Sequence, residues 1–409
     1  MKMRKIWLFS VLLGFTLSLF PQQVEEESLV INIEVPVRVF KGDVFIDDLT
    51  IDDFEILEDG VSQQIEAVYL VRKKNIERSE EKRRFSPDTA RNFFLFFEIT
   101  EYNERIGQAV DYFIRDVIDP GDFLTIVTPV KTYRLRGKAL EVKSRDEVIT
   151  QLKALLRRDA LQGNSEYRNT IKELSSLAAS LSASLSQDPN LQRRDDIFAS
   201  ENLDISLDEQ LVLYQSLLEK LENLRLVDQE QLLRFAEFLE NKEGRKFVFL
   251  FYQREYIPQI DERIMNQYMA MYQDEPQLLQ VLTGITDFFR RDISFDLDYV
   301  KKVYADSSIS IHFLFISQLF ENVYGITFKE QSEDIFSAFR EMAHSTGGYI
   351  ESSANPRHLV RRAVAASKNY YLLYYTPKNY SRDGDFHNIE VRIKGGKYRV
   401  VHRQGYFAD

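Results

Sequence analysis

The sequence predicts an α/β fold: a doubly wound, mostly parallel sheet with a helical insertion, plus a small β module formed by the N- and C-terminal segments. Short apolar runs within residues 93–97, 244–256 and 308–316 predict strands that are buried on both faces, as in parallel sheets. Helical apolar periodicities lie between these runs, which is typical of strands that alternate with crossover helices. Alternating apolar and polar residues near both ends of the chain predict half-buried strands.

The first residues predict export. Lys2, Arg4 and Lys5 precede an apolar run over residues 6–20, and Pro21 follows. This order is typical of a secretory signal, so residues 1–20 are expected to be a signal peptide. The run is short for a membrane span, which needs about 20 residues, although an uncleaved anchor remains an alternative. We expect an exported protein, in the periplasm or outside the cell and at its surface, with no membrane span after signal cleavage.

The composition excludes several classes of function. The 409 residues leave room for two or three domains, and 44% hydrophobic residues can build sizeable cores. The net charge of −11 makes binding to nucleic acid unexpected, because such binding needs a basic surface. The absence of cysteine excludes disulfides, thiolate metal sites and cysteine nucleophiles.

The two ends of the chain are expected to form one β module. Residues 29–71 alternate apolar and polar side chains, and Asp59-Gly60 predicts a hairpin turn. Residues 72–91 are rich in charges of both signs and predict a linker, either a short exposed helix or a loop. Residues 369–409 read as a C-terminal β segment that would complete the module, because two or three strands are marginally stable alone.

Residues 92–368 are expected to form the α/β domain. A helical insertion at about 160–243 interrupts it, with a capping box at Ser206 and a leucine stripe on either side of Pro189. The insertion predicts an antiparallel helical hairpin that packs on the domain. The alternative is a coiled coil that binds a partner or self-associates through residues 165–240.

Three blocks of sequence together resemble the bacterial exported proteins called von Willebrand factor A-related. The blocks are residues 35–60, the strand–helix–strand core with Gly244-Arg-Lys246, and residues 342–406, which include Tyr370-Tyr-Leu-Leu-Tyr-Tyr-Thr-Pro377. The resemblance implies a von Willebrand factor A-like fold for residues 92–368. It also implies a site at the carboxyl end of the sheet, where family members often bind a cation through Asp-x-Ser-x-Ser, a loop threonine and a later aspartate.

This chain differs from that family pattern in the first motif, in the loop threonine and in the later aspartate. The first motif is Glu98-Ile-Thr100-Glu-Tyr102, and Gln253 stands near the position of the later aspartate. The loop threonine is ambiguous between Thr170 and Ser165. Magnesium requires close octahedral oxygen ligands, so we expect a degenerate site with no metal and no cofactor. An altered site, in which Glu98, Thr100 and Glu101 hold Mg²⁺ or Mn²⁺, remains the alternative.

The sequence predicts a binding protein rather than an enzyme. It contains no His-Glu-x-x-His, Gly-x-Ser-x-Gly or Walker motif. The leading hypothesis is an exported adhesion or scaffold protein that binds another protein, of unknown identity, without metal. The expected binding face contains Glu98, Thr100, Tyr102, Gln253 and Glu255. The alternatives are a metal-dependent adhesion domain and an envelope assembly factor that acts through the helical hairpin.

Overall fold

The computed structural model describes residues 31–135, 142–185, 205–225, 227–289, 295–307, 309–317 and 326–408. The chain divides into two units, residues 1–31 and residues 32–409, and the description below concerns the second unit. The predicted signal peptide, residues 1–20, lies outside the described residues.

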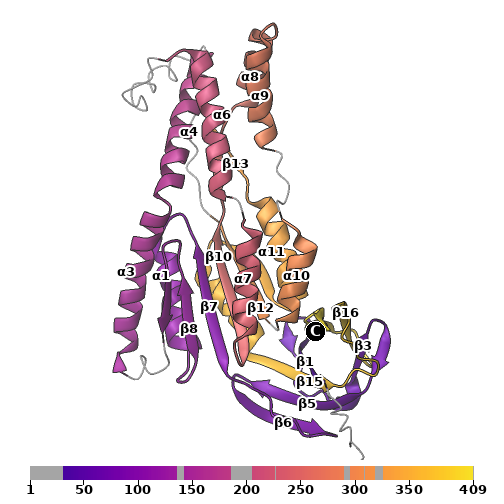
Figure 1. Ribbon diagram of the computed structural model, residues 1–409. Coiled ribbons are helices and arrows are strands. Elements are labelled where there is room, and N and C mark those ends of the chain that lie inside the picture. The colour runs from indigo at the N-terminus through magenta and orange to yellow at the C-terminus, as the bar shows by residue number, and fades with distance from the viewer. Residues whose placement is uncertain are drawn as a thin grey trace, which may run out of the picture. The chain divides into compact units, whose positions relative to one another are not determined.

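A six-stranded sheet forms the centre of this unit (Figure 1), in the order β14-β12-β10-β7-β8-β9. Neighbouring strands are parallel except at the β8–β9 edge, which is antiparallel. The strand β10 is buried along its whole length, because it is a central strand covered on both faces. The bounds are β7 (Arg91–Glu98), β8 (Phe123–Val127), β9 (Thr132–Leu135), β10 (Arg245–Gln253), β12 (Ile309–Ile316) and β14 (Tyr349–Ser353).

Helices cover both faces of the central sheet. On one face, side chains of α1 (Glu104–Tyr112), the π-helical turn η2 (Phe113–Val117), α3 (Arg145–Gly163) and α12 (Pro356–Lys368) form a core with Phe93, Phe97 and Phe251 of the strands. On the other face, α7 (Gln229–Glu240), α10 (Leu297–Asp306) and α11 (Glu333–Ser345) pack against side chains of β10 and β12. The carboxyl ends of β7 and β10 remain between these two layers.

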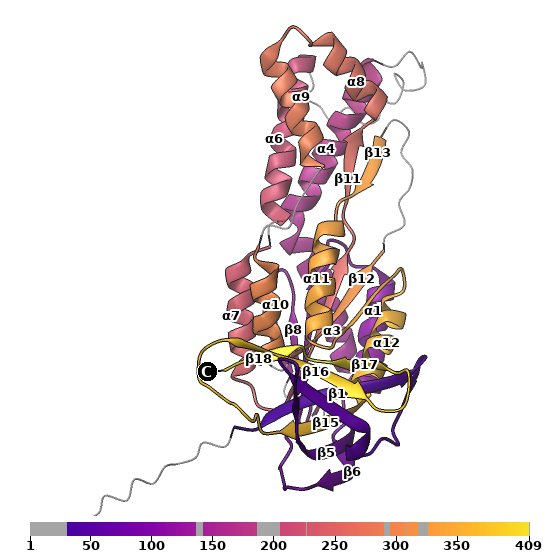
Figure 2. The same ribbon diagram turned by 90° about the vertical axis from the view of Figure 1, so that its right-hand side faces the viewer.

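The predicted insertion is part of a larger helical subdomain with its own core (Figure 2). It contains α4 (Ser165–Ser184), α6 (Leu207–Arg225), α8 (Glu262–Met271) and α9 (Pro276–Phe288), with the antiparallel pair β11 (Tyr256–Ile260) and β13 (Ile326–Glu330). Leu174, Leu181 and Leu218 are buried in this core. The leucine stripes are therefore covered by the chain's own α9 and β11, and any self-association through residues 165–240 would have to use the outer helix faces.

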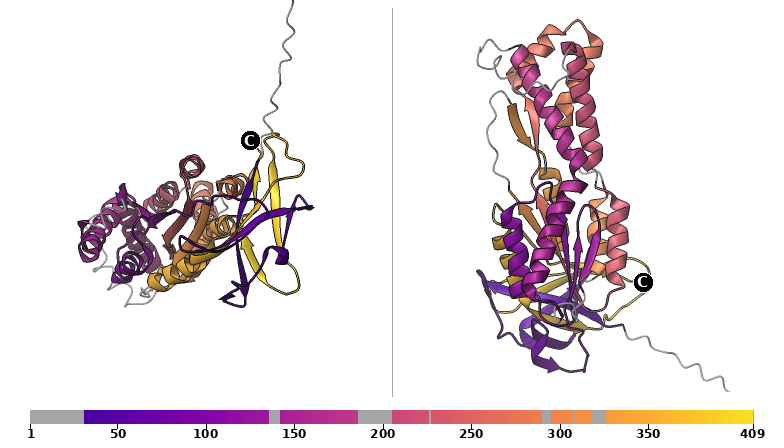
Figure 3. Two further views of the ribbon diagram at one scale, coloured as in Figure 1. Left: turned by 90° about the horizontal axis from the view of Figure 1, so that it is seen from below. Right: turned by 90° about the vertical axis from the view of Figure 1, so that its left-hand side faces the viewer.

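Two antiparallel sheets combine strands from both ends of the chain, and Figure 3 shows the first (indigo) and last (yellow) strands side by side. One sheet has the order β17-β1-β15-β5-β6, with β2 paired to β1, and the other has the order β18-β16-β3-β4. A single 3₁₀ turn, η1 (Ile51–Asp53), precedes β3. The bounds are β1 (Ile33–Lys41), β2 (Val44–Phe45), β3 (Phe54–Glu58), β4 (Val61–Gln63), β5 (Ile65–Arg72), β6 (Asn75–Glu81), β15 (Asn369–Tyr375), β16 (Phe386–Ile393), β17 (Arg399–His402) and β18 (Gly405–Phe407).

The charged stretch 72–91 differs from the expected helix or loop. Residues 75–81 form β6, which pairs with β5 at the edge of its sheet. The side chains of β6 are mostly exposed and charged. Such an edge strand needs little apolar surface, and its charges disfavour pairing with another chain.

The predicted fold class is wrong for the molecule as a whole. Among the described residues, four strand pairings are parallel and ten are antiparallel. The central sheet is only partly parallel, and the terminal strands form further antiparallel sheets with a half-barrel. The structure is therefore mixed α/β, and a doubly wound, mostly parallel, von Willebrand factor A-like sheet is not shown. Apolar runs reveal that a strand is buried, but they do not specify its direction or its neighbour.

Candidate functional site

The carboxyl ends of β7 and β10 are joined by one side chain. The amide oxygen Oε1 of Gln253 accepts hydrogen bonds from the Thr100 backbone N (2.9 Å), the Thr100 hydroxyl (3.0 Å) and the Glu101 backbone N (3.0 Å). Gln253 is 2% exposed, so these contacts lie away from bulk water. Three donors that converge on one point suit an acceptor oxygen and repel a cation.

A polar groove opens beside this contact, with a volume of about 650 Å³. Its floor is the turn after β7 and the end of β10, and one wall is the first part of α4. The groove combines acidic, basic and aromatic side chains, with Ile171 and Ala354 as its aliphatic residues. Its charged and tyrosine side chains are Glu101, Glu104, Arg105, Tyr167, Arg168, Lys172, Arg254 and Tyr256.

A second hollow, the apolar cavity, has a volume of about 530 Å³. It lies on the face of the sheet that α7, α10 and α11 cover, and Phe96, Val248 and Leu250 form its floor. Leu232 and Phe235 of α7 and Phe339 of α11 are among the residues of its walls. The groove and the cavity share Thr100, Tyr167 and Gln253 as lining residues, so the two hollows adjoin at the strand ends.

Glu98 lies in the apolar cavity and not in the polar groove. Solvent reaches its side chain, yet the surrounding protein desolvates the carboxylate and raises the pKa of Glu98 above its ordinary value. The carboxylate has no ion pair or side-chain hydrogen bond within the described ranges.

Tyr102 does not join the other predicted site residues. Its ring packs beside the sheet core, with the Arg157 guanidinium of α3 5.6 Å from the ring centroid. Its hydroxyl occupies the space where a Cβ at Gly107 of α1 would lie, so this glycine permits the close approach. The tyrosine therefore supports the packing of α1 and α3 and lines neither hollow.

Glu255 is held in a buried network. It forms an ion pair with Arg225 at the end of α6, and the Tyr252 hydroxyl donates to its Oε1 (2.6 Å). Arg225 also donates to the Gln331 carbonyl (2.5 Å). Glu255 thus fastens the helical subdomain to the end of β10 and presents little surface to a partner, since it is 9% exposed.

Sequence reasoning missed Arg225 and Tyr167. Arg225 ends the leucine stripe of α6 with a charge that is 6% exposed, and Tyr167 lines both hollows from the first turn of α4. The one sequence signal for Arg225 was a charged residue at the end of an apolar helical stripe. That signal pointed to a buried ion pair only once the fold had placed Glu255 beside Arg225.

The alternative metal ligands are not gathered at one point. Glu98 lines the apolar cavity, Glu101 lines the polar groove, and Thr100 lies between them, donating its hydroxyl to Gln253. Thr170 and Ser165 are both on α4, where Thr170 is buried and the Ser165 hydroxyl donates to the Gln162 carbonyl (3.0 Å). In the part of the chain that the structure describes, no group of three or more His, Asp or Glu side chains is arranged to hold a metal ion.

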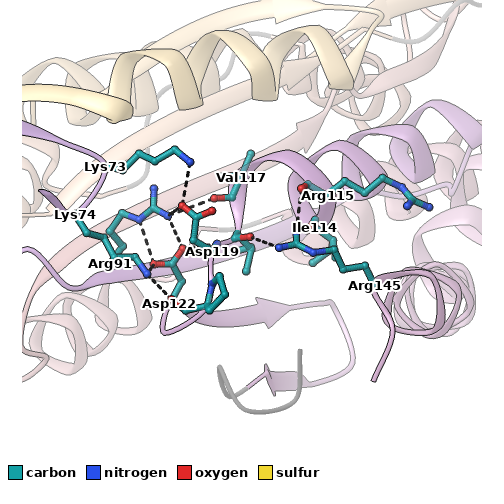
Figure 4. Close-up of polar contacts among 11 residues, drawn as sticks. Lys73, Lys74, Arg91, Ile114, Arg115, Val117, Asp119, Asp122 and Arg145 are labelled. Atoms are coloured by element: carbon teal, nitrogen blue, oxygen red, sulfur yellow. Dashed lines mark hydrogen bonds and ion pairs between the residues drawn. The ribbon is translucent and has the colours of Figure 1, made fainter. Parts of the chain in front are cut away.

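A second buried ionic cluster lies at the opposite, amino end of β7 (Figure 4). Arg91 pairs with Asp122 (2.5 Å) and with Asp119 (2.9 Å). Lys73 and Lys74, from the turn between β5 and β6, pair with Asp119 (3.2 Å) and Asp122 (2.8 Å) respectively. This cluster joins the terminal β sheet to the central sheet, and every charge in it has a partner of opposite sign, so it is structural.

Comparisons with known proteins give little further guidance. The chain matches no protein-family model and no curated protein. One solved structure with partial similarity is that of the human COPII-coat protein Sec24c, at 7% sequence identity and a TM-score of 0.25. The match covers 79% of this chain and 44% of that chain, so this chain spans less than half the length of Sec24c. A likeness of this size supports no conclusion about fold or function. Within the described ranges, no helix has the length and apolar character needed to cross a membrane.

Proposed function

We propose that this chain is an exported, non-enzymatic adhesion or scaffold protein that binds another protein through the polar groove without a metal ion. The observation that carries the proposal is the contact between Gln253 and the end of β7. The amide oxygen occupies the point at which three donors converge. A cation there would face N–H and O–H groups in place of oxygen lone pairs.

The groove has the chemistry of a protein contact surface. Tyrosine and arginine contribute strongly to protein interfaces, because they combine a large contact area with hydrogen-bond donors. Tyr167, Arg168 and Tyr256 provide such groups here, and Glu101 and Lys172 add charges of both signs. Mixed charges in an open polar groove favour a polypeptide segment over a small apolar molecule.

Two further proposals use the same region. In the first, the chain is a metal-dependent adhesion protein with Mg²⁺ or Mn²⁺ at Glu98, Thr100 and Glu101. In the second, it is an envelope assembly factor that acts through its helical hairpin. The structure favours a combined surface over a separate hairpin site, because Tyr167, Arg168 and Lys172 of α4 are themselves one wall of the groove.

Site-specific photo-crosslinking in the native host tests the leading proposal. A photoreactive amino acid replaces Lys172, which lines the groove, and in a matched variant it replaces the adjacent exposed residue Glu173, which does not. We expect position 172 to crosslink one discrete protein, with the same yield when EDTA is present, and position 173 not to do so.

Two results would contradict the proposal. Equal crosslinking from both positions would show that the groove is not the contact surface. Crosslinking from position 172 that disappears with EDTA and returns with Mg²⁺ would favour the metal-dependent alternative.

A further inference from the structure

The apolar cavity is a second hollow with a chemistry of its own. Its lining is mostly aliphatic and aromatic and comes from the floor of the sheet and from α7, α10 and α11. Its volume of about 530 Å³ lies in the range of pockets that hold small organic molecules. The proposed protein-binding function uses the adjoining polar groove, which shares Thr100, Tyr167 and Gln253 with this hollow but does not include Glu98.

Four carboxylates line the cavity, and three of them already have partners. Glu255 pairs with Arg225, and Glu166 pairs with Lys220 (3.2 Å). Asp228 caps α7 by accepting a hydrogen bond from the Gln231 backbone N (3.2 Å). Of these four cavity carboxylates, only that of Glu98 has neither an ion pair nor a side-chain hydrogen bond with another described residue.

The position of Glu98 follows from the strand. Phe96 and Glu98 are alternate residues of β7, so their side chains lie on the same face of the sheet. Phe96 packs against Phe235 of α7, with ring centroids 4.6 Å apart. Glu98 is therefore the polar residue at the carboxyl end of the β7 face that carries Phe94 and Phe96. Desolvation by the surrounding protein is the one cause of the raised pKa of Glu98, with no charged side chain contributing.

A carboxylate in such surroundings favours a cation. Desolvation disfavours the charged form of the acid, and a charge of opposite sign compensates for the lost hydration. The same apolar walls favour a hydrocarbon or aromatic body. A neutral alcohol would provide only a hydrogen bond, and a carboxylic acid would add a second negative charge.

We propose that the apolar cavity binds a small apolar molecule that carries one amine, whose ammonium group pairs with the Glu98 carboxylate. The body of the molecule packs between the floor of β7 and β10 and the side chains of α7 and α11. Specificity comes from Glu98, because the remaining carboxylates of the cavity are already engaged.

Calorimetric titration with three molecules that share one aromatic body tests this assignment. The probes are 2-(1-naphthyl)ethylamine, 2-(1-naphthyl)ethanol and 3-(1-naphthyl)propionic acid. We expect the amine to bind at least about tenfold more tightly than the alcohol, as a charged hydrogen bond typically provides, and the acid to bind more weakly than either.

Three variants locate the effect. Glu98→Gln keeps the shape of the side chain and removes its charge, so the amine should lose its advantage of about tenfold over the alcohol. Glu166→Gln is the matched control, because Glu166 lines the same cavity but pairs with Lys220, and it should leave the advantage unchanged. Val248→Phe fills the floor of the cavity and should weaken the binding of all three probes, with thermal unfolding used to verify that each variant is folded.

The assignment is overturned if wild-type protein does not bind the amine, or if it binds the three probes equally. It is also overturned if Glu98→Gln retains the preference for the amine in a folded protein. None of these three results depends on protein binding at the polar groove, so the outcome is separate from that of the crosslinking experiment.

Discussion

Single side chains decide what each hollow can hold. In the polar groove, the Gln253 amide oxygen satisfies the two backbone N–H groups and the hydroxyl that follow β7. In the apolar cavity, the Glu98 carboxylate has no such partner in the described structure. The two residues lie at the ends of adjacent parallel strands, yet the Gln253 oxygen accepts three hydrogen bonds and the Glu98 carboxylate accepts none among the described residues.

His387 provides a pH-dependent link between the two ends of the chain. Its ring nitrogens lie 2.7 Å from Asp59 and 3.5 Å from Asp383. Burial lowers the pKa of His387, but hydrogen bonds to the two carboxylates outweigh it, so the pKa of His387 is raised overall. A raised pKa in the folded state stabilises the fold at low pH, and this stabilisation is lost as the pH rises through the folded-state value.

We expect His387→Gln to lower the free energy of unfolding by up to about 1 kcal/mol, as for other partly exposed ion pairs. The loss should be largest below about pH 6.5, the ordinary histidine pKa, and should shrink at higher pH. Urea unfolding of both proteins at a series of pH values measures it. A difference that grows with increasing pH would contradict the assigned pKa direction.

Residue type predicted part of the candidate site. Thr100 and Gln253 meet at the strand ends, and Glu98 and Glu255 lie nearby; their role as a binding face stays a prediction. Tyr102 was misplaced, because the alternation of side chains ends with the strand and the chain then turns into α1. The Tyr102 side chain packs against Gly107 of α1 and Arg157 of α3. Neither contact can be read from the alternation of side chains along a strand.

At the scale of elements, burial was easier to predict than pairing. The strands β7, β10 and β12 lie where continuous apolar runs predicted them, and the caps at Ser144 and Asn355 begin α3 and α12. Strand direction was overestimated as parallel, because most pairings are antiparallel and are made by strands from the two ends of the chain. The pairings β1–β15, β1–β17, β5–β15 and β3–β16 join strands that are roughly 300 or more residues apart, as Val35 and Leu373 are, and no local pattern specifies them.

The charged strand β6 is a strand that the sequence pattern did not predict. Its sequence has a low apolar content, and so it resembles a linker or an exposed helix. The structure pairs it with β5 at a sheet edge, where charged side chains face water on both sides. An edge position removes the requirement for apolar residues on which strand prediction depends.

At the scale of the whole molecule, ion pairs connect sheets whose strands are far apart in the sequence. The Arg91 cluster joins the turn between β5 and β6 to the central sheet, and Arg245 of β10 pairs with Glu34 of β1 (3.2 Å). The side chains of Asp122 and Arg91 are 0% and 3% exposed, so their pair is screened little by salt. These contacts hold the terminal β sheet against the amino end of the central sheet.

Asp122→Ala should destabilise the protein by about 3–5 kcal/mol, because it leaves the buried Arg91 guanidinium short of a partner. Asp119→Ala is the matched control. Its carboxylate is 35% exposed, so the expected loss is nearer to about 1 kcal/mol. Equilibrium unfolding in urea measures both values, and equal losses for the two variants would contradict the structural role assigned to Asp122.

Under the proposed function, the chain's own Gln253 amide fills the carboxyl end of the sheet and leaves no place for a divalent cation. Calorimetric titration of the folded wild-type protein with Mg²⁺ and with Mn²⁺ measures whether a cation binds there. We predict no saturable heat with either ion. Saturable heat that disappears in Glu98→Ala would contradict the claim and would establish the metal-dependent alternative.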